Sequence, residues 1–487
     1  MEGSGRLIAE RIQVNKITMR RALLCLALLQ IALPVLAQTQ SVSPAERQAK
    51  SWLDAFNSGD HSKLLEFLKQ NRPSAVEHID DEIAFRERTG GFTLIKPEES
   101  TPGHFVALLK EKDSDQFARI DVEVAAEPPY QITKLELRAI PRPTEFAIPR
   151  VSEKEAVAQL RQRLEQETAA DRFSGSVLVA QNGTIVFEHA YGMADREKKI
   201  PNELGTKFRI GSMNKMFTAV SILQLAEAGK IRLDDPVGKY LPDYPNKEIA
   251  SKVTIHDLLT HTGGTGDIFG PEFEQHRLEL RTLQDYVNLY GQRGPEFDPG
   301  SRFAYSNYGF LLLGVIVEKV SGQSYYDYVR EHIFKPAGMT STDSLPENEA
   351  VANRSIGYMK PGPGPWRSNV DTLPYRGTSA GGGCSTVEDL YRFAMALQAD
   401  KLLDAKHTEL LITGKVETGR GDKYAYGFFE RDDNGLKCFG HGGGAPGMNG
   451  DLKICPESGY VIAVLANLDP PAAQNASEFV GARLPLK

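Results

Sequence analysis

The sequence contains a serine and a lysine whose spacing suits nucleophilic catalysis. Ser212 and Lys215 begin a stretch in which apolar residues recur at helical spacing, until Gly229 ends it. Residues three apart lie on one face of a helix, so we expect the two side chains to meet. A serine hydroxyl becomes a good nucleophile when a nearby base takes its proton. A lysine serves as that base only when neutral, and both burial and the positive end of the helix dipole lower its pKa. We therefore predict Ser212 as nucleophile and Lys215 as base.

A tyrosine and an asparagine two residues apart precede a second apolar helix, expected over 310–320. At this place both side chains can point into one cleft. Tyr305 is then suited to pass a proton to the leaving group, and Asn307 to bind a substrate amide and to hold Lys215. Taken alone, each pattern has a plainer interpretation: S-x-x-K as a helix cap with a solvated lysine, and Y-x-N as a packed aromatic with a helix cap.

A glycine-rich segment follows the strand-like run 436–440. His441 and Gly443 lie in it, and glycines there allow a substrate to lie against the strand edge as a further strand would. We expect both residues to contact the substrate. The N–H groups of Gly444 and Ser212 are the predicted oxyanion hole.

Together the three patterns resemble the family of class C β-lactamases, D-Ala-D-Ala carboxypeptidases, D-amino-acid peptidases and β-lactamase-like esterases. That family carries S-x-x-K, then Y-x-N, then K-T-G or H-x-G, and all three occur here in that order. The stretches 254–264 and 380–388 also look like family segments. The resemblance covers about residues 155–470. It implies that Ser212 is acylated and then freed by water.

His441 stands where the β-lactamases carry the lysine of K-T-G, a permanent cation that faces the substrate carboxylate. Histidine has an unperturbed pKa of ~6.5 and is mostly neutral at pH 7. A β-lactam or a peptide with a free C-terminus loses much of its anchor, whereas esters, amides and D-amino acid derivatives lose less. We therefore expect a carboxylesterase or a D-amino-acid or D-Ala-type peptidase rather than an efficient β-lactamase. Its substrate would be a small ester, an amide or a cell-wall peptide.

Two other functions remain open. One is a non-catalytic receptor that is acylated by penicillin or binds cell-wall fragments without turnover. The other is a binding platform whose N-terminal module does the recognition. Catalysis is favoured by the presence of all three residues, Ser212, Lys215 and Tyr305. An active site that has lost its activity need not keep them all.

Three further patterns carry little weight. The segment around Ser379 matches the G-x-S-x-G nucleophile elbow, but the preceding residues are polar and include Pro374 where that elbow needs a buried strand. We place Ser379 in a loop near the cleft. The spacing of His256 and His261 fits no zinc site. The segment 442–447 matches G-x-G-x-x-G, but a dinucleotide-binding motif leads into a helix and a strand is expected here. We predict no metal and no cofactor.

Composition indicates a soluble globular protein in two folded units. The chain has 487 residues, which exceeds the size of one ordinary domain. Hydrophobic residues make up 41% and charged residues 25%, the balance of a soluble globular protein. A net charge of -7 gives no reason to expect nucleic acid as a partner. The apolar run 22–36 follows two arginines and ends in a small-residue cleavage site at Ala37. We predict a signal peptide over 1–37, with the true start at Met19, export to the periplasm or medium, and no stable membrane span after cleavage.

The remaining chain divides at a proline-bearing linker, 142–152. Residues 43–141 indicate a small α+β domain that resembles the NTF2-like and cystatin-like folds. Two helices start it, and strands are expected over 104–109, 117–124 and 132–140. Residues 153–487 form the predicted hydrolase domain. Its fold class is α/β, because strands at both ends flank a mostly helical middle. The family resemblance implies an antiparallel sheet flanked by helices, with a helical subdomain.

Cys438 and Cys455 lie about symmetrically around the predicted turn 445–448. A disulfide between them and a pair of small buried hydrophobes are both open, and we favour the second interpretation.

Overall fold

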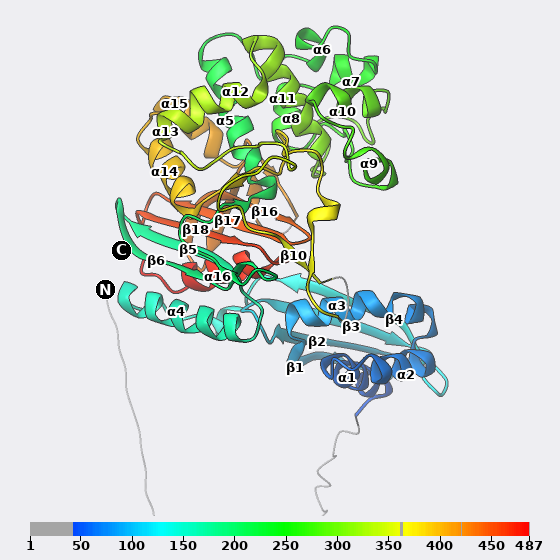
Figure 1. Ribbon diagram of the computed structural model, residues 1–487. Coiled ribbons are helices and arrows are strands. Elements are labelled where there is room, and N and C mark those ends of the chain that lie inside the picture. The colour runs from blue at the N-terminus through cyan, green and yellow to red at the C-terminus, as the bar shows by residue number, and fades with distance from the viewer. Residues whose placement is uncertain (1–41, 361–363, 420, 487) are drawn as a thin grey trace, which may run out of the picture. The chain divides into compact units, whose positions relative to one another are not determined.

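Three α-helices and a meander of strands build the first part of the described chain (Figure 1). The helices are α1 (Pro44–Asn57), α2 (His61–Asn71) and α3 (Ile79–Thr89). The antiparallel strands pair in chain order and are β1 (Phe92–Ser100), β2 (His104–Glu111), β3 (Phe117–Val124) and β4 (Ile132–Ile140). The strands expected from sequence are present, whereas α3 and β1 were not expected. Pro97 and a run of charged residues hide β1, which is an edge strand.

The computed structural model describes residues 42–360, 364–419 and 421–486. The predicted signal peptide and the start at Met19 lie outside these ranges. Residues 43–487 form one compact unit. Across the described ranges, no helix is both long and apolar enough to cross a membrane.

An eight-stranded antiparallel sheet organises the remainder of the chain. Its order is β13-β14-β15-β16-β17-β18-β5-β6. The early strands are β5 (Gly175–Gln181) and β6 (Thr184–Tyr191), joined at Asn182 and Gly183, which both have positive φ. The late strands are β13 (Val416–Glu417), β14 (Lys423–Tyr424), β15 (Phe429–Asp433), β16 (Leu436–Ala445), β17 (Met448–Cys455) and β18 (Tyr460–Ala466). The pairing of β18 with β5 joins the two ends of this region, as the sequence predicted.

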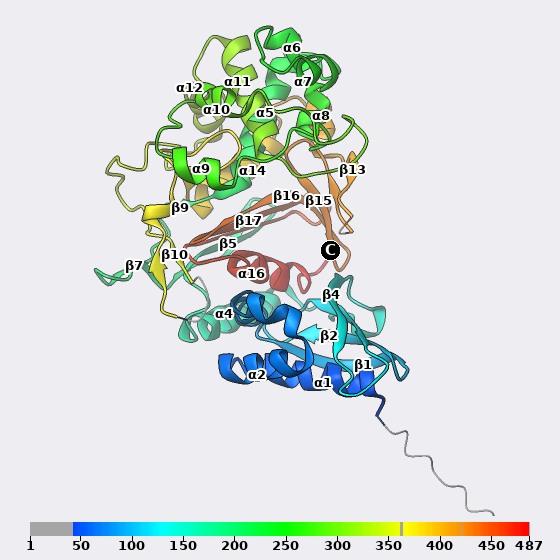
Figure 2. The same ribbon diagram turned by 90° about the vertical axis from the view of Figure 1, so that its right-hand side faces the viewer.

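Helices cover both faces of this sheet (Figures 1 and 2). One face packs against α4 (Glu153–Ala169) and α16 (Ala472–Gly481), and the other against α5 (Asn214–Glu227) and α14 (Val387–Gln398). Each face buries its own apolar core. Burial of this apolar area is the main driving force for stacking the layers.

Most of the other helices gather on the α5 side of the sheet (Figure 1). They are α6 (Val237–Tyr240), α7 (Lys247–Lys252), α8 (Ile255–Leu259), α9 (Pro271–His276), α10 (Leu283–Tyr290), α11 (Asn307–Ser321), α12 (Tyr325–Val329), α13 (Lys335–Ala337) and α15 (Ala405–Ile412). The short strands are β7 (Met193–Asp195), β8 (Ile200–Pro201), β9 (Phe208–Arg209), β10 (Tyr358–Met359), β11 (Arg367–Ser368) and β12 (Cys384–Ser385). This is the layered α/β fold with a helical subdomain that the family resemblance implied.

Cys438 and Cys455 form a disulfide between β16 and β17. The interpretation as two separate buried hydrophobes was therefore wrong. The physical reason is the register of the hairpin: Phe439 pairs with Ile454, which sets the two cysteines opposite each other with a Cα–Cα distance of 4.1 Å. Cys384 is buried and free.

Candidate active site

The turn that carries Ser212 is held between the sheet and helix α5. A single 3-10 turn (Gly211–Met213) leads into α5, so Ser212 lies just before the helix and Lys215 in its first turn. Lys215 Nζ is 3.2 Å from Ser212 Oγ, as the spacing predicted. Ser212 remains partly exposed whereas Lys215 is fully buried, so the hydroxyl is open to a substrate while its base is shielded from water.

Neutral oxygens surround the Lys215 ammonium position. Nζ lies 2.7 Å from Asn307 Oδ1 and 2.5 Å from the carbonyl oxygen of Ala380. The rings of Tyr305 and Phe310 lie 4.7 and 5.5 Å from it. Burial lowers the pKa of Lys215 to about 7, with the charge of Asp267 acting in the opposite direction. A large fraction of the side chain is therefore neutral at physiological pH and able to accept a proton.

Tyr305 packs directly against this pair. Burial raises the pKa of its hydroxyl, and a hydrogen bond with Ser212 acts the other way. The phenol therefore stays protonated at neutral pH and can donate. The ring of His261 lies against Tyr305, with 4.2 Å between the ring centroids. His261 Nδ1 accepts a hydrogen bond from the Ser306 backbone N–H, which fixes the start of α11.

Asn307 is oriented from both ends of its amide. Its Oδ1 accepts from Lys215, while Nδ2 donates to the two carboxylate oxygens of Asp267 at 3.0 and 3.1 Å. Ser306 caps α11 by accepting from the Gly309 N–H, which sets the position of Asn307 in the first turn. The predicted contact between Asn307 and Lys215 is present, and Asp267 is an addition.

His441 lies in the middle of β16 and is almost fully buried. Its Nδ1 is hydrogen-bonded to the Gly442 carbonyl. A carbonyl oxygen only accepts, so Nδ1 carries the proton and Nε2 accepts from the Tyr424 hydroxyl at 3.2 Å. Burial first, and the Lys215 charge second, lower the pKa of His441 to about 3. The imidazole is therefore neutral throughout the physiological range.

The glycines of β16 bring the strand against the Ser212 turn. A Cβ on Gly443 would lie 1.9 Å from the Ile210 carbonyl oxygen, and one on Gly211 would lie 2.9 Å from the Gly444 nitrogen. Gly443 is buried and Gly444 exposed. The close approach places the Gly444 nitrogen beside the nucleophile turn. The role of this N–H group in an oxyanion hole stays a prediction. Contact between Gly443 and a substrate stays a prediction.

The residues that we set aside have structural contacts. Ser379 is fully buried, and its hydroxyl donates to the Phe310 carbonyl at 2.9 Å. No strand of the described chain leads directly into it, so the elbow geometry is missing. Its loop instead supplies the Ala380 carbonyl to Lys215. His256 Nδ1 is hydrogen-bonded to the Tyr426 hydroxyl at 2.7 Å.

Comparison with known proteins assigns this arrangement to a family. The family model described as Beta-lactamase matches residues 160–485. The chain belongs to the β-lactamase family. It is 32% identical over 301 residues to penicillin-binding protein 4* of Bacillus subtilis. The match covers 57% of this chain and 64% of that relative, so the chain spans less than two thirds of the relative's length.

Two solved structures show the same likeness. A penicillin-binding protein from Bacillus halodurans is 34% identical with a TM-score of 0.61, over 66% of this chain and 99% of that one. A D-stereospecific amidohydrolase from Streptomyces sp. is 28% identical with a TM-score of 0.58, over 67% of this chain and 98% of that one. The matched proteins include ones named for penicillin binding and ones named for hydrolysis.

Three contacts of this β-lactamase-family site escaped the sequence analysis: the Asp267 carboxylate, the Tyr424 hydroxyl and the Ala380 carbonyl. Asp267 lies three residues beyond the family-like stretch 254–264, in a loop with no periodicity to mark it. Tyr424 belongs to a strand of two residues. A backbone carbonyl such as that of Ala380 leaves no trace in sequence at all.

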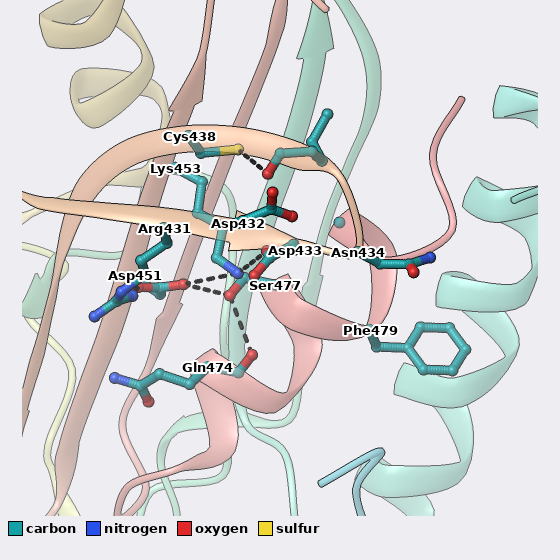
Figure 3. A network of polar contacts seen from close by, with 12 residues as sticks. Arg431, Asp432, Asp433, Asn434, Cys438, Asp451, Lys453, Gln474, Ser477 and Phe479 are labelled. Carbon is teal, nitrogen blue, oxygen red and sulfur yellow. Dashed lines mark hydrogen bonds and ion pairs between the residues drawn. The ribbon is translucent and has the colours of Figure 1, made fainter. Parts of the chain in front are cut away.

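Behind β16, on the face toward α16, lies a buried network of charges (Figure 3). Asp451 pairs in register with Gly442, contacts Arg431 at 3.3 Å and accepts from the Ser477 hydroxyl. Lys453 lies between Asp451, at 3.9 Å, and Asp433, to which it is hydrogen-bonded. The network joins β15, β17 and α16. It lies beside Gly442 of β16, which has no side chain to fill this face of the sheet.

Proposed function

We propose that the protein is a serine hydrolase that cleaves small esters or amides through an acyl-enzyme on Ser212. The observation that carries the proposal is the state of Lys215. Its Nζ is 3.2 Å from Ser212 Oγ, it is buried among neutral oxygens, and its pKa of about 7 leaves it able to accept the serine proton.

The arrangement supports a complete acyl transfer. Neutral Lys215 takes the proton as Ser212 Oγ attacks the carbonyl carbon, and the N–H groups of Ser212 and Gly444 stabilise the oxyanion. Tyr305 donates its proton to the departing alcohol or amine and recovers one from Lys215. Water then attacks the ester carbonyl of the acyl-enzyme and releases Ser212 with the acid product.

Within this class we propose that esters, amides and D-amino acid derivatives are better substrates than β-lactams. The support is His441, whose neutral imidazole offers no charge to a substrate carboxylate. The likeness to a protein named as a D-stereospecific amidohydrolase supports amides in particular. A cephalosporin turnover rate equal to that of a dedicated β-lactamase would contradict this preference.

The test is hydrolysis of p-nitrophenyl acetate and butyrate beside labelling by a fluorescent penicillin. We expect turnover that Ser212→Ala abolishes and that Ser379→Ala retains. Labelling of the native chain without turnover supports a receptor and overturns the hydrolase. If neither labelling nor turnover occurs, a binding platform is supported instead.

We also propose that the chain is exported and cleaved after Ala37. The Cys438–Cys455 disulfide supports this, because disulfides persist in oxidising compartments. The intact mass of protein recovered from the periplasm or the medium should correspond to a chain that begins at Gln38. A recovered chain that retains residues 1–37 would contradict the proposal.

A further inference from the structure

Asp267 places a carboxylate at the active site of this chain. It follows Gly266 in the loop between α8 and α9 and is partly buried. Both of its oxygens accept from Asn307 Nδ2, and Oδ1 also accepts from the Ile268 N–H at 2.7 Å. One amide side chain therefore separates this carboxylate from the Lys215 base.

Among the residues that the structure describes, the groups that donate hydrogen bonds to the Asp267 carboxylate are neutral. Arg293 donates to the backbone carbonyl of Asp267 at 2.8 Å rather than to its side chain. Within residues 42–360, 364–419 and 421–486 the carboxylate has no ion-pair partner. A partly buried anion that lacks a counter-charge attracts a cation more strongly than an exposed one does, because the local dielectric is lower.

No side chain of the described residues forms an ion pair with this carboxylate, and the Arg293 guanidinium is hydrogen-bonded to its backbone carbonyl. Lys215 is substantially neutral, and His441 carries no charge at neutral pH. The charge of Asp267 reaches the centre of the site, since it raises the pKa of both Lys215 and Tyr305. The site therefore favours a substrate that brings a positive charge and disfavours one that brings a carboxylate.

We propose that Asp267 binds a protonated amine on the acyl group of the substrate, so that the preferred substrates are esters or amides of amine-bearing acids with the amine free. This rests on the proposed hydrolase function. The acyl group is the part to hold, because it stays attached to Ser212 Oγ between the two chemical steps, whereas the leaving group departs after the first.

The experiment compares alanine p-nitroanilide, as D and L enantiomers, with the N-acetylated forms that cannot carry the charge. We expect kcat/KM to favour the free amine by about ten- to hundredfold for the accepted enantiomer, the range of one charge-assisted hydrogen bond. Asp267→Asn also disturbs Asn307 and lowers turnover of every substrate. The readout is therefore the ratio of the two kcat/KM values, from which a shared loss cancels, and this ratio should fall to about one.

Glu272→Gln is the matched control. Glu272 is an exposed acid five residues along the same segment, so the substitution removes the same charge without touching Asn307. Its ratio should equal that of the native chain. Binding of alaninamide and N-acetylalaninamide to the Ser212→Ala protein, with and without Asp267→Asn, gives the same comparison where turnover is too slow to measure.

The outcomes separate the two proposals. A native chain that hydrolyses p-nitrophenyl esters through Ser212 but shows no preference for the free amine overturns the role of Asp267 alone. A preference that survives Asp267→Asn also overturns it, and leaves Asp267 as a residue that only positions Asn307. Absence of any Ser212-dependent turnover overturns the hydrolase function itself.

Discussion

Two lysines, Lys215 and Lys453, are almost completely buried on opposite faces of the same sheet, and they have opposite character. Lys453 contacts the carboxylates of Asp433 and Asp451, whose charges outweigh its burial and raise its pKa. Lys215 contacts a serine, an amide and a backbone carbonyl, and burial lowers its pKa to about 7. Burial alone therefore does not make a base. A buried lysine becomes a base when no carboxylate contacts it directly, because its pKa then stays low.

The effect of Asp267 on Lys215 is intermediate between no carboxylate and a carboxylate in direct contact. It is separated from Lys215 by the Asn307 amide, so its charge raises the pKa of Lys215 without forming an ion pair. A carboxylate in direct contact would hold the lysine permanently charged, as the network behind the sheet holds Lys453. The spacing by one amide keeps the base usable near neutral pH while leaving a negative charge at the site.

The largest expected effect comes from removing the Lys215 base. Lys215→Ala should lower kcat/KM for p-nitrophenyl butyrate by roughly 10²–10⁴-fold, the usual contribution of a general base. Lys215→Arg should lose about as much activity, because a guanidinium cannot be deprotonated. Lys319→Ala, at an exposed lysine of α11, is the control and should be active. Full activity in Lys215→Arg would show that the site needs the charge rather than the base.

The next effect is on stability at the other lysine. Lys453→Met removes the cation beside the Asp433 carboxylate and one of the two cations beside Asp451, which keeps its contact with Arg431. It should lower the free energy of unfolding by about 3 kcal/mol, the lower end of the range for a broken buried ion pair. Denaturant unfolding measures this. Lys437→Met, at an exposed lysine of β16, should change it by less than about 0.5 kcal/mol. Adding Asp451→Asn to Lys453→Met should restore part of the loss, and no restoration would mean that the charges are not coupled.

The smallest effect should be a shift of the pH profile. Activity requires neutral Lys215, so kcat/KM rises as pH increases through the pKa of this lysine. Asp267 raises that pKa, and Asp267→Asn therefore moves the rise to lower pH. We expect a shift of about half a pH unit, since the two groups interact through an intervening amide. A shift to higher pH in profiles for p-nitrophenyl butyrate would reverse the sign that the structure requires.

Sequence predicted local geometry better than distant contacts. The spacing of Ser212 and Lys215 determined that they would meet, because the helical repeat is the same wherever the helix lies. The Asn-Gly turn likewise predicted the hairpin between β5 and β6. The contacts of Lys215 with Asn307 and Ala380 span 92 and 165 residues. The family motif indicated the first of these, and nothing local indicated the second.

The charges behind the sheet show the same limit. Asp451 and Lys453 alternate with Leu452 and Ile454, a pattern that usually marks a solvent-exposed strand face. Both charged residues are buried because α16 covers that face, and the helix brings Ser477 to Asp451. The disulfide depended in the same way on the register of β16 and β17, which one sequence alone left open.

The central claim is that Lys215 is the neutral base for Ser212, and the pH dependence of kcat/KM for p-nitrophenyl butyrate tests it most directly. The profile of the native chain should rise with a single ionisation near pH 7, the pKa of Lys215. A profile that stays flat down to pH 5, or that rises only near pH 10 as for an exposed lysine, would contradict the account.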